Sequence, residues 1–339
     1  IAKGYKVAIC EQMEDPALAK GLVKRDIIRV VTPGTVIESS MLQDDKNNYI
    51  ASIYITEKKA GVCFADVSTG TAHATVLTGE KLGPEIISEL CRYSPSEVLF
   101  NAAILDYKEV TAYIKQQLAC SVELLDEAAF APDACMEEMR AQFGDAPEKT
   151  AGLAPESPAF TALAVLLGYL KETQKKGVER LKTVHNYAEA QYMQLSPVTR
   201  ANLELTETMR GREKKGTLLW VLDKTQTAMG KRLMRAWIGQ PLVNVAAINA
   251  RLDGVEELVG DSVARADIAA ALSKIFDIER LMTRTVYGSA SPREIYALAA
   301  TCEQLPRLKA LARPFGSAEI TALLADIDEL SDIKELIFA

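Results

Sequence analysis

NLELTETMRGREKKGTLLWVLDKTQTAMGKRLMRAW, residues Asn202–Trp237, is the stretch that decides how the second half of the chain folds. Two apolar runs with helix-like spacing flank a basic polar turn at Arg210–Gly216. The triplet Met229-Gly230-Lys231 invites comparison with a phosphate-binding loop. That loop needs a glycine five residues before its second glycine and a Ser or Thr after its lysine. Thr225 and Arg232 hold those positions, so we interpret the stretch as a structural helix entry.

The charges of this region allow two interpretations. Residues 200–240 carry nine Lys or Arg and four Asp or Glu, a local excess of positive charge in an acidic chain. Such a patch is able to meet phosphate groups, but a solvated helix face is the simpler explanation. We expect Lys231, Arg232 and Arg235 to face outward, and the turn Arg210–Lys215 to be solvated rather than bound to DNA.

Composition places the chain among ordinary globular proteins. Its 339 residues are 48% hydrophobic and 25% charged, which is a typical balance for folded domains, and this length predicts about two or three of them. The net charge of −7 argues against a protein that coats nucleic acid non-specifically.

The cysteines and the hydropathy pattern bear on the compartment. None of the six cysteines is separated from another by two residues, the spacing of metal knuckles and redox motifs. The sequence has neither a signal peptide nor an apolar run near about 18 residues. We therefore expect a reducing, cytoplasmic compartment and no membrane association.

The ends of the sequence suggest a piece of a longer protein. The chain begins with Ile rather than Met and enters a buried-strand pattern almost at once, at Gly4–Cys10. Its last pattern, Ile320–Phe338, is that of an amphipathic helix without a stop signal.

Residues 1–40 are expected to be the tail of a larger α/β domain. Val7–Cys10 and Asp26–Val31 have strand patterns, and Thr32–Thr35 contains Pro then Gly, which marks a turn. So short a region is too small to bury a core of its own.

Residues 45–180 change from a strand meander to alternating helices and strands. Two β-branched runs, Tyr49–Ile55 and Gly61–Val67, predict a hairpin. The order that follows predicts an α/β domain resembling ribonuclease H. The further strands are expected at 71–77, 97–100 and 122–125, and the helices at 82–92, 107–117, 133–143 and 159–174, with a loop at 144–158.

From about residue 195 the pattern is helical throughout, so an all-α domain is predicted at 187–339, after a boundary near 178–190. Ser196-Pro197 is a helix start, with Pro at the first helical position. The helices are expected at 197–209, 216–223, 227–237, 245–259, 262–272, 277–286, 291–311 and 317–338.

Few residues offer catalytic chemistry. In a ribonuclease H-like domain Asp66 could bind magnesium, but that chemistry needs two to four converging carboxylates, and Asp106 is the only further candidate. A cap on the Ser68-Thr69-Gly70 turn is the simpler role for Asp66. Two histidines, His73 and His185, are too few for a zinc site, and we expect His185 on the surface. No catalytic, metal or cofactor site is predicted.

The sequence blocks then resemble one family over nearly the whole chain. The strongest block is Thr227–Leu233 with Trp237, and the chain is similar to the MutS family of DNA mismatch-recognition proteins. The other blocks are Gly4–Gln12, Asp15-Pro16, Lys20-Gly21, Arg29–Thr35, Asn47–Tyr49, Phe64–Gly70, Arg200–Leu205, Thr217–Leu219, Leu222-Asp223, Asp277–Leu281 and Arg293.

This resemblance implies a multidomain protein that is α/β and then all-α. Residues 1–40 would end the mismatch-binding domain, 45–180 would be a ribonuclease H-like connector domain without nuclease activity, and 187–339 would be the first part of the helical core, or lever, domain. The family's mismatch wedge would precede residue 1, and its ATPase, which uses ATP and Mg²⁺, would follow residue 339. The chain itself is therefore expected to be non-catalytic and to transmit signals between these parts.

The resemblance also implies partners for the full-length parent: double-stranded DNA with mismatches, the protein MutL, and a second copy of itself. Lys20, Lys24 and Arg25 are the candidates for contact with the DNA backbone. The helix at 133–143 is the candidate for MutL docking, through Glu137 and Glu138.

Two rival functions stay open. One is a metal-dependent nuclease that uses the ribonuclease H-like domain. The other is a MutS paralogue acting in recombination; such proteins generally lack the mismatch-binding domain, and residues 1–35 argue against that assignment.

Overall fold

The computed structural model describes residues 1, 4–14, 23–118, 120–188 and 191–339. It forms two compact units. The first unit comprises Ile1–Leu42 and Asn47–Glu189, and the second comprises Gln43–Lys46 and Ala190–Ala339. The short segment Gln43–Lys46 thus belongs to the second unit, although its neighbours on both sides in the sequence belong to the first.

The first unit is built on a six-stranded mixed sheet with the order β7-β6-β3-β4-β5-β8. The three central strands form the predicted antiparallel meander, while β6 and β7 continue in parallel beyond β3, and β8 runs parallel to β5. The strands are β3 (Ile50–Ile55), β4 (Lys59–Asp66), β5 (Thr71–Thr78), β6 (Glu97–Phe100), β7 (Ser121–Leu124) and β8 (Thr183–Asn186).

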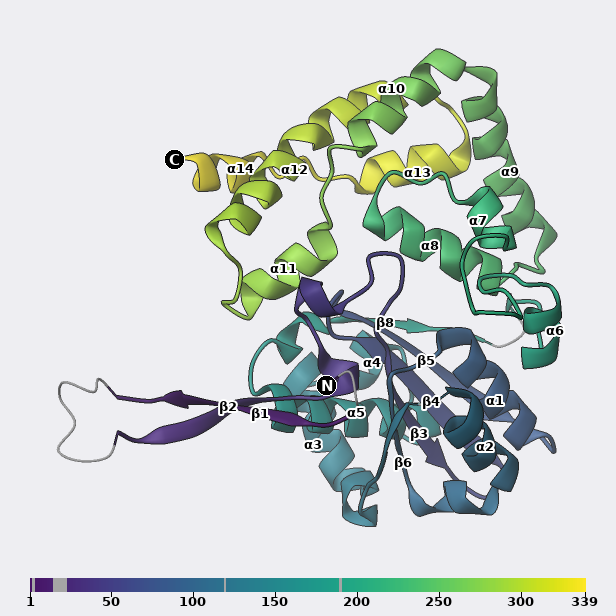
Figure 1. Ribbon diagram of the computed structural model, residues 1–339, viewed down its shortest axis with the longest axis vertical. Coiled ribbons are helices and arrows are strands. Elements are labelled where there is room, and N and C mark those ends of the chain that lie inside the picture. The colour runs from purple at the N-terminus through teal and green to yellow at the C-terminus, as the bar shows by residue number, and fades with distance from the viewer. Residues whose placement is uncertain (2–3, 15–22, 119, 189–190) are drawn as a thin grey trace. The chain divides into compact units, whose positions relative to one another are not determined.

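Helices cover both faces of this sheet (Figure 1). Because side chains alternate along a strand, Gly61 and Phe64 of β4 point to opposite faces. Phe64 stacks on Tyr93 of α1 with ring centroids 4.0 Å apart, whereas Gly61 lies against the backbone of Pro158, at the start of α5. The helices are α1 (Leu82–Tyr93), α2 (Lys108–Tyr113), which continues as a π-helical turn (Ile114–Leu118), α3 (Pro132–Phe143), α4 (Pro147–Ala151) and α5 (Pro158–Gln174).

The core of the first unit lies between α5 and the sheet. Helix α5 is apolar nearly all round because it packs on β3 and β4 with one side and on α3 with another. Leu163, Leu166 and Leu170 of this helix are almost completely buried. The predicted helix at 159–174 is confirmed, as are the predicted strands of this unit.

Two elements of the first unit depart from the sequence-based expectation. The loop expected at 144–158 contains the one-turn helix α4, and the boundary expected near 178–190 contains strand β8. β8 is only four residues long and is mostly exposed, so its sequence carries little alternation. Its pairing with β5, more than 100 residues earlier, is what makes it a strand.

A two-stranded antiparallel ribbon, β1 (Val7–Gln12) and β2 (Arg25–Val31), extends from the first unit (Figure 1). The two strands predicted in residues 1–40 are therefore confirmed. Most of the ribbon is exposed, and burial begins at Arg29 and Val31, where β2 meets α5.

The second unit is helical, as predicted, and the strand content of its described residues is one isolated bridge, Tyr192 to Leu242. Helix α12 packs against α10, α11 and α14, and α9 packs against α13. Its helices are α6 (Pro197–Asn202), α7 (Leu218–Leu222), α8 (Ala228–Gly239), α9 (Val245–Gly260), α10 (Ser262–Leu272), α11 (Ile278–Val286), α12 (Pro292–Ala312), α13 (Ala318–Asp326) and α14 (Ser331–Phe338).

Two predicted helices of this unit are wrong in extent. The helix expected at 197–209 ends at Asn202, because Glu204 adopts a positive φ angle that breaks a right-handed helix. The helix expected at 317–338 is two helices, separated where Leu330 has a φ of 50°.

Among the described residues, no helix is both long and apolar enough to span a bilayer.

Candidate functional site: an arginine cradle around residues 43–46

Asp66 is a structural cap. Its side chain is fully buried. One carboxylate oxygen accepts hydrogen bonds from the Asn47 side chain at 2.8 Å and the Asn48 backbone at 3.1 Å. The other accepts from the backbone and hydroxyl groups of Ser68, at 2.9 and 2.7 Å. The predicted cap is confirmed, and these four bonds occupy the carboxylate that a metal would need.

The other candidate metal-binding and catalytic residues do not form a common site with Asp66. Asp106 is exposed at the end of a 3₁₀ turn. Within the described ranges, no group of three or more His, Cys, Asp or Glu side chains is placed to hold a metal ion. His73 and His185 face each other from β5 and β8 with ring centroids 5.1 Å apart. Burial, with a smaller contribution from His185, lowers the pKa of His73 to about 4, while His185 is exposed as predicted.

The two glutamates proposed for docking lie in different environments on α3. Glu137 is exposed. Glu138 is half-buried and forms an ion pair with Lys171 of α5 at 2.6 Å, so it helps to fix α3 on the helix beneath.

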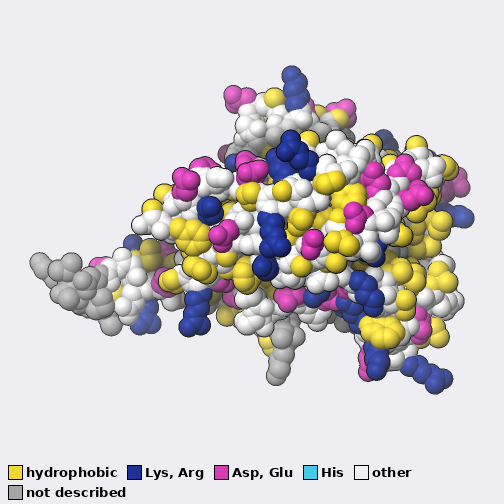
Figure 2. All heavy atoms as spheres, turned by 90° about the horizontal axis from the view of Figure 1, so that it is seen from above, with side chains coloured by type: hydrophobic (Ala, Val, Ile, Leu, Met, Phe, Trp, Pro, Cys, Tyr) yellow, Lys and Arg dark blue, Asp and Glu magenta, His cyan; other side chains and the backbone are white. Residues whose placement is uncertain are grey.

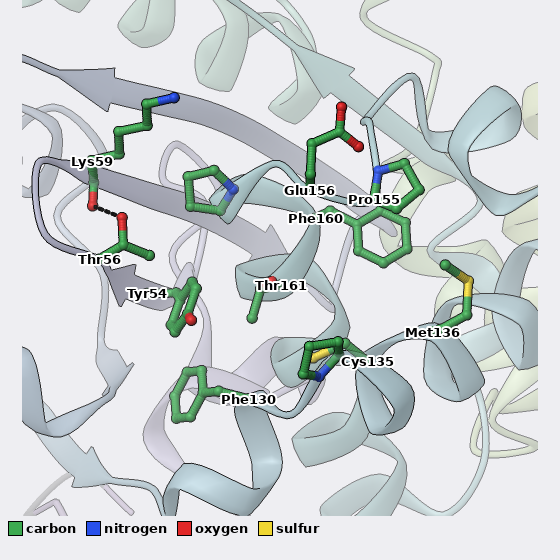
Figure 3. Close-up of a pocket in the computed structure, with 12 residues that line it drawn as sticks. Tyr54, Thr56, Lys59, Phe130, Cys135, Met136, Pro155, Glu156, Phe160 and Thr161 are labelled. Atoms are coloured by element: carbon green, nitrogen blue, oxygen red, sulfur yellow. Dashed lines mark hydrogen bonds between the residues drawn. The ribbon is translucent and has the colours of Figure 1, made fainter.

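Beside α3 lies a pocket of about 290 Å³ (Figure 3). Cys135 and Met136 of α3 contribute to its wall. Tyr54 and Phe130 stack in it with centroids 5.2 Å apart and an interplanar angle of 15°. The lining is mainly aromatic, proline and sulfur-containing, which favours an apolar side chain as its occupant.

Two of the three basic residues proposed to touch DNA, Lys24 and Arg25, fall at the far end of the ribbon. Lys20 lies outside the described residues. Lys24 and Arg25 are exposed, and the Lys24 backbone donates a hydrogen bond to the Glu14 carboxylate at 2.7 Å. This end of the ribbon therefore carries both signs of charge, because Glu14 and Asp26 lie close to the two cations in space or sequence.

Figure 2 shows a similar mixture on the face of the molecule that it presents. Lys, Arg, Asp and Glu side chains are interspersed there with hydrophobic ones. A surface that binds nucleic acid without sequence preference carries a field of one sign, and this face does not.

A dense set of polar contacts surrounds residues 43–46, which we call the strap. Three arginines donate hydrogen bonds to its backbone carbonyl groups. Arg280 donates to the carbonyls of residues 43 and 46, at 2.9 and 2.7 Å. Arg232 donates to the carbonyl of residue 44 at 3.2 Å, and Arg235 to that of residue 45 at 3.0 Å. Four consecutive carbonyl groups are thus bound by guanidinium groups from α8 and α11.

The side chains of the strap add ionic contacts. Asp45 pairs with Lys214 at 3.1 Å and with Arg235 at 3.3 Å, and Lys46 pairs with Glu207 at 2.7 Å. Partial burial acts to raise the pKa of Asp45, but the hydrogen bonds and charges of Lys214 and Arg235 outweigh it and hold that pKa below its usual value. We call Lys214, Arg232, Arg235 and Arg280 the cradle.

Acidic residues hold the cradle in place. Arg232 is only 4% exposed, and it makes a bidentate pair with Asp277 at 2.7 and 2.8 Å and a further pair with Glu279 at 2.7 Å. Burial acts to raise the pKa of Asp277, but the hydrogen bonds and charge of Arg232 outweigh it and hold that pKa below its usual value. Because Asp277 is also the N-cap of α11, this pair joins α8 to α11. Lys214 is held likewise by Asp223 at 2.8 Å.

The cradle corrects two expectations. Arg232 and Arg235 do not face outward: both side chains are largely buried against the strap. The turn at Arg210–Lys215 is solvated as expected at Arg210, Arg212 and Lys215, which are exposed, but Lys214 joins Asp45 to Asp223. The sequence did carry one signal for the pairing of Arg232. The block Thr227–Leu233 contains this cation, and the block Asp277–Leu281 contains the acids Asp277 and Glu279.

Comparisons with known proteins cover this whole arrangement. Three family models match in order: MutS domain I at residues 1–40, MutS domain II at 48–184 and MutS domain III at 198–337. The strap falls in the interval between the first two.

Curated relatives match along almost the full chain. The DNA mismatch repair protein MutS of Alkaliphilus oremlandii is 40% identical over 340 residues, 99% of this chain and 38% of the relative. That of Ruminiclostridium cellulolyticum is 42% identical over 337 residues, again 99% of this chain and 38% of the relative. The chain thus spans about two fifths of the length of these relatives. With three MutS domain models matched in order, the chain belongs to the MutS family of DNA mismatch repair proteins.

Proposed function

We propose that this chain is the coupling part of a mismatch-repair protein, which links a DNA-binding region to an ATPase without doing chemistry itself. The observation that carries the proposal is the strap: a segment between two parts of the first unit is bound through four consecutive carbonyls by helices of the second. Two sites that share one moving element are what allosteric coupling requires.

In this proposal the parent protein binds double-stranded DNA with mismatches, uses ATP and Mg²⁺, and pairs with a second copy of itself. Those activities would reside in the full-length protein. Residues 45–180 would be a ribonuclease H-like connector. The central strand order and directions of the sheet support that assignment, and the capped Asp66 favours a connector over a nuclease.

The coupling role is tested in the full-length protein that contains this chain. The measured quantity is the factor by which mismatched duplex changes the rate of ATP hydrolysis. Replacing Arg280 by Lys keeps the charge but removes the fork that spans two carbonyls, so we expect this factor to fall toward one. Lys231→Ala, at a half-buried position of α8 outside the contacts to residues 43–46, is the control. A normal factor in Arg280→Lys would refute the coupling role.

We further propose that the connector docks MutL through the exposed face of α3. Two observations support it: Glu137 projects into solvent, and the aromatic pocket opens beside the same helix. Such a pairing of an apolar anchor site with a charged rim is typical of protein interfaces.

Reversing one charge tests this docking face. Glu137→Lys in the full-length protein should weaken MutL binding roughly tenfold, because a like charge is placed against a partner surface that matched the acid. Glu80→Lys, also exposed but next to α1, should bind normally. Equal MutL affinities for the two variants, measured by surface plasmon resonance, would remove α3 from consideration.

A further inference from the structure

The strap is anchored to different units at adjacent residues. The carbonyl of Lys46 is bound by Arg280 of the second unit. The next side chain, Asn47, is bonded to Asp66 of the first unit at 2.8 Å. Asn48 adds a bond to the Pro33 carbonyl at 2.9 Å. A single peptide bond therefore separates the two anchored segments, with no slack between them.

The chain before the strap is anchored in the first unit as well. Arg29, at the end of β2, donates to Gln174 of α5 at 2.6 Å and to the Thr35 carbonyl at 2.8 Å. The fully buried Glu97 accepts from the Gly34 backbone at 3.1 Å and from the Thr32 hydroxyl. The turn at 32–35 is thus part of the first unit's core, and only residues 36–42 lie between this region and the strap.

The contact between strap and cradle is almost purely polar. The strap reads Gln43-Asp44-Asp45-Lys46, without an apolar side chain, and residues 43 and 44 are exposed. Its release would uncover the charged groups that hold it. Contacts of this kind open at lower free energy than packed helices, and salt screens the more exposed pairs, Lys46 with Glu207 and Lys214 with Asp45.

From these observations we propose that the strap is a detachable coupling between the chain that leaves the first unit and the helices α8 and α11. When docked, the strap makes these helices follow movements of residues 29–48. When released, it lets the two units move independently. The proposal deepens the coupling role above by naming its element, and it rests on that role only for the signal that is passed on.

Release of the strap is measurable as trypsin cleavage after Lys46. A docked strap cannot extend into a protease cleft, so cleavage reports the open population. In the 339-residue chain, Arg235→Ala and Arg280→Lys should each raise the cleavage rate at this bond roughly tenfold, the scale of one charge-assisted hydrogen bond. Neither variant alters the cleaved sequence. Added NaCl should raise the rate in the unmodified chain.

Lys231→Ala is the matched control, because it removes a cation from the same helix, one turn away and outside the cradle. Its cleavage rate should equal that of the unmodified chain. Tryptophan fluorescence in urea separates release from global unfolding: cleavage at Lys46 should be faster than unfolding in every variant. The proposal would be overturned if cleavage required global unfolding, or if the cleavage rate were the same in the cradle variants as in the unmodified chain.

A second readout tests coupling itself. A donor fluorophore at Lys108 of α2 and an acceptor at Asp267 of α10 report the distribution of distances between the units. Both positions are exposed. This distribution should broaden in Arg235→Ala and stay unchanged in Lys231→Ala. Faster cleavage without broadening would show a strap that opens but couples nothing. Because neither readout uses DNA, ATP or MutL, this failure is distinct from failure of the proposed function.

Discussion

Arg232 illustrates how a single residue organises the second unit. It is nearly inaccessible to solvent, it bridges α8 to the cap of α11, and it also holds the strap. Three of its partners are the carboxylates of Asp277 and Glu279 and the carbonyl of residue 44. An arginine in this position joins elements that are distant in the sequence.

Removing Arg232 should therefore destabilise the second unit. Arg232→Ala leaves the largely buried Asp277 without its main partner, which costs about 3 kcal/mol of unfolding free energy. Lys231→Ala should change it by less than about 0.5 kcal/mol. Urea unfolding followed by tryptophan fluorescence measures both values. A loss below about 1 kcal/mol for Arg232→Ala would contradict this account.

The sequence alone predicted some residue roles and missed others for a physical reason. The cap formed by Asp66 was predictable because Ser68 lies two residues away, within the range of local turn chemistry. The cradle was not, because Arg235 and Asp45 lie 190 residues apart. Amphipathic spacing shows which side of a helix is polar, but it does not distinguish water from a buried acidic partner.

At the scale of elements, local pattern predicted most helices and strands. The hairpin of β3 and β4 and the all-apolar α5 carry strong signals over many residues. The predictions that went wrong were those that depend on one backbone angle, as at Leu330, or on a distant neighbour, as in β8. The residues at which strands begin and end are likewise set by tertiary contacts rather than by local preference.

The packing of α5 on β4 depends on Gly61. A Cβ atom there would lie 1.9 Å from the Pro158 carbonyl oxygen, which is backbone and cannot rotate away. Gly61→Ala should lower the unfolding free energy of the first unit by about 2 kcal/mol or more. Gly168→Ala in α5 is the matched control, because its Cβ would meet only ordinary contacts at 3.7 Å.

The control should move in the opposite direction. Alanine is the better helix former by roughly 0.5–1 kcal/mol, so Gly168→Ala should be neutral or stabilising. Thermal unfolding by circular dichroism, with the assignment to the first unit checked by hydrogen exchange in β4, compares the two variants. Equal stability for both would show that α5 shifts freely on the sheet.

At the scale of the whole molecule, the two units meet in sequence at the strap, which also falls between the residues matched by MutS domains I and II. Family boundaries and structural boundaries therefore agree there. They differ on the other side of this junction, because β2 and the turn at 32–35 belong structurally to the first unit and contact its six-stranded sheet. A movement of the residues matched by MutS domain I would reach the six-stranded sheet through Arg29 and Glu97 before it reaches the strap.

The remaining question at this scale is whether the ribbon meets DNA. If Lys24 and Arg25 each neutralise one phosphate, the logarithm of the binding constant should depend less steeply on the logarithm of salt concentration once both are replaced by Gln. The expected change in slope is about 1.8 for two contacts on duplex DNA. The full-length protein and a mismatched duplex are required, with binding followed by fluorescence anisotropy across a salt series.

A paired control decides between phosphate contact and general charge. Lys175→Gln with Lys176→Gln removes the same charge from another exposed part of the first unit. If Lys24 and Arg25 act as contacts, only their replacement reduces the slope. Equal slopes for the two double variants would assign both cations to solvation. In that outcome the contribution of this chain to DNA binding would be entirely indirect, through the strap and the helices that hold it.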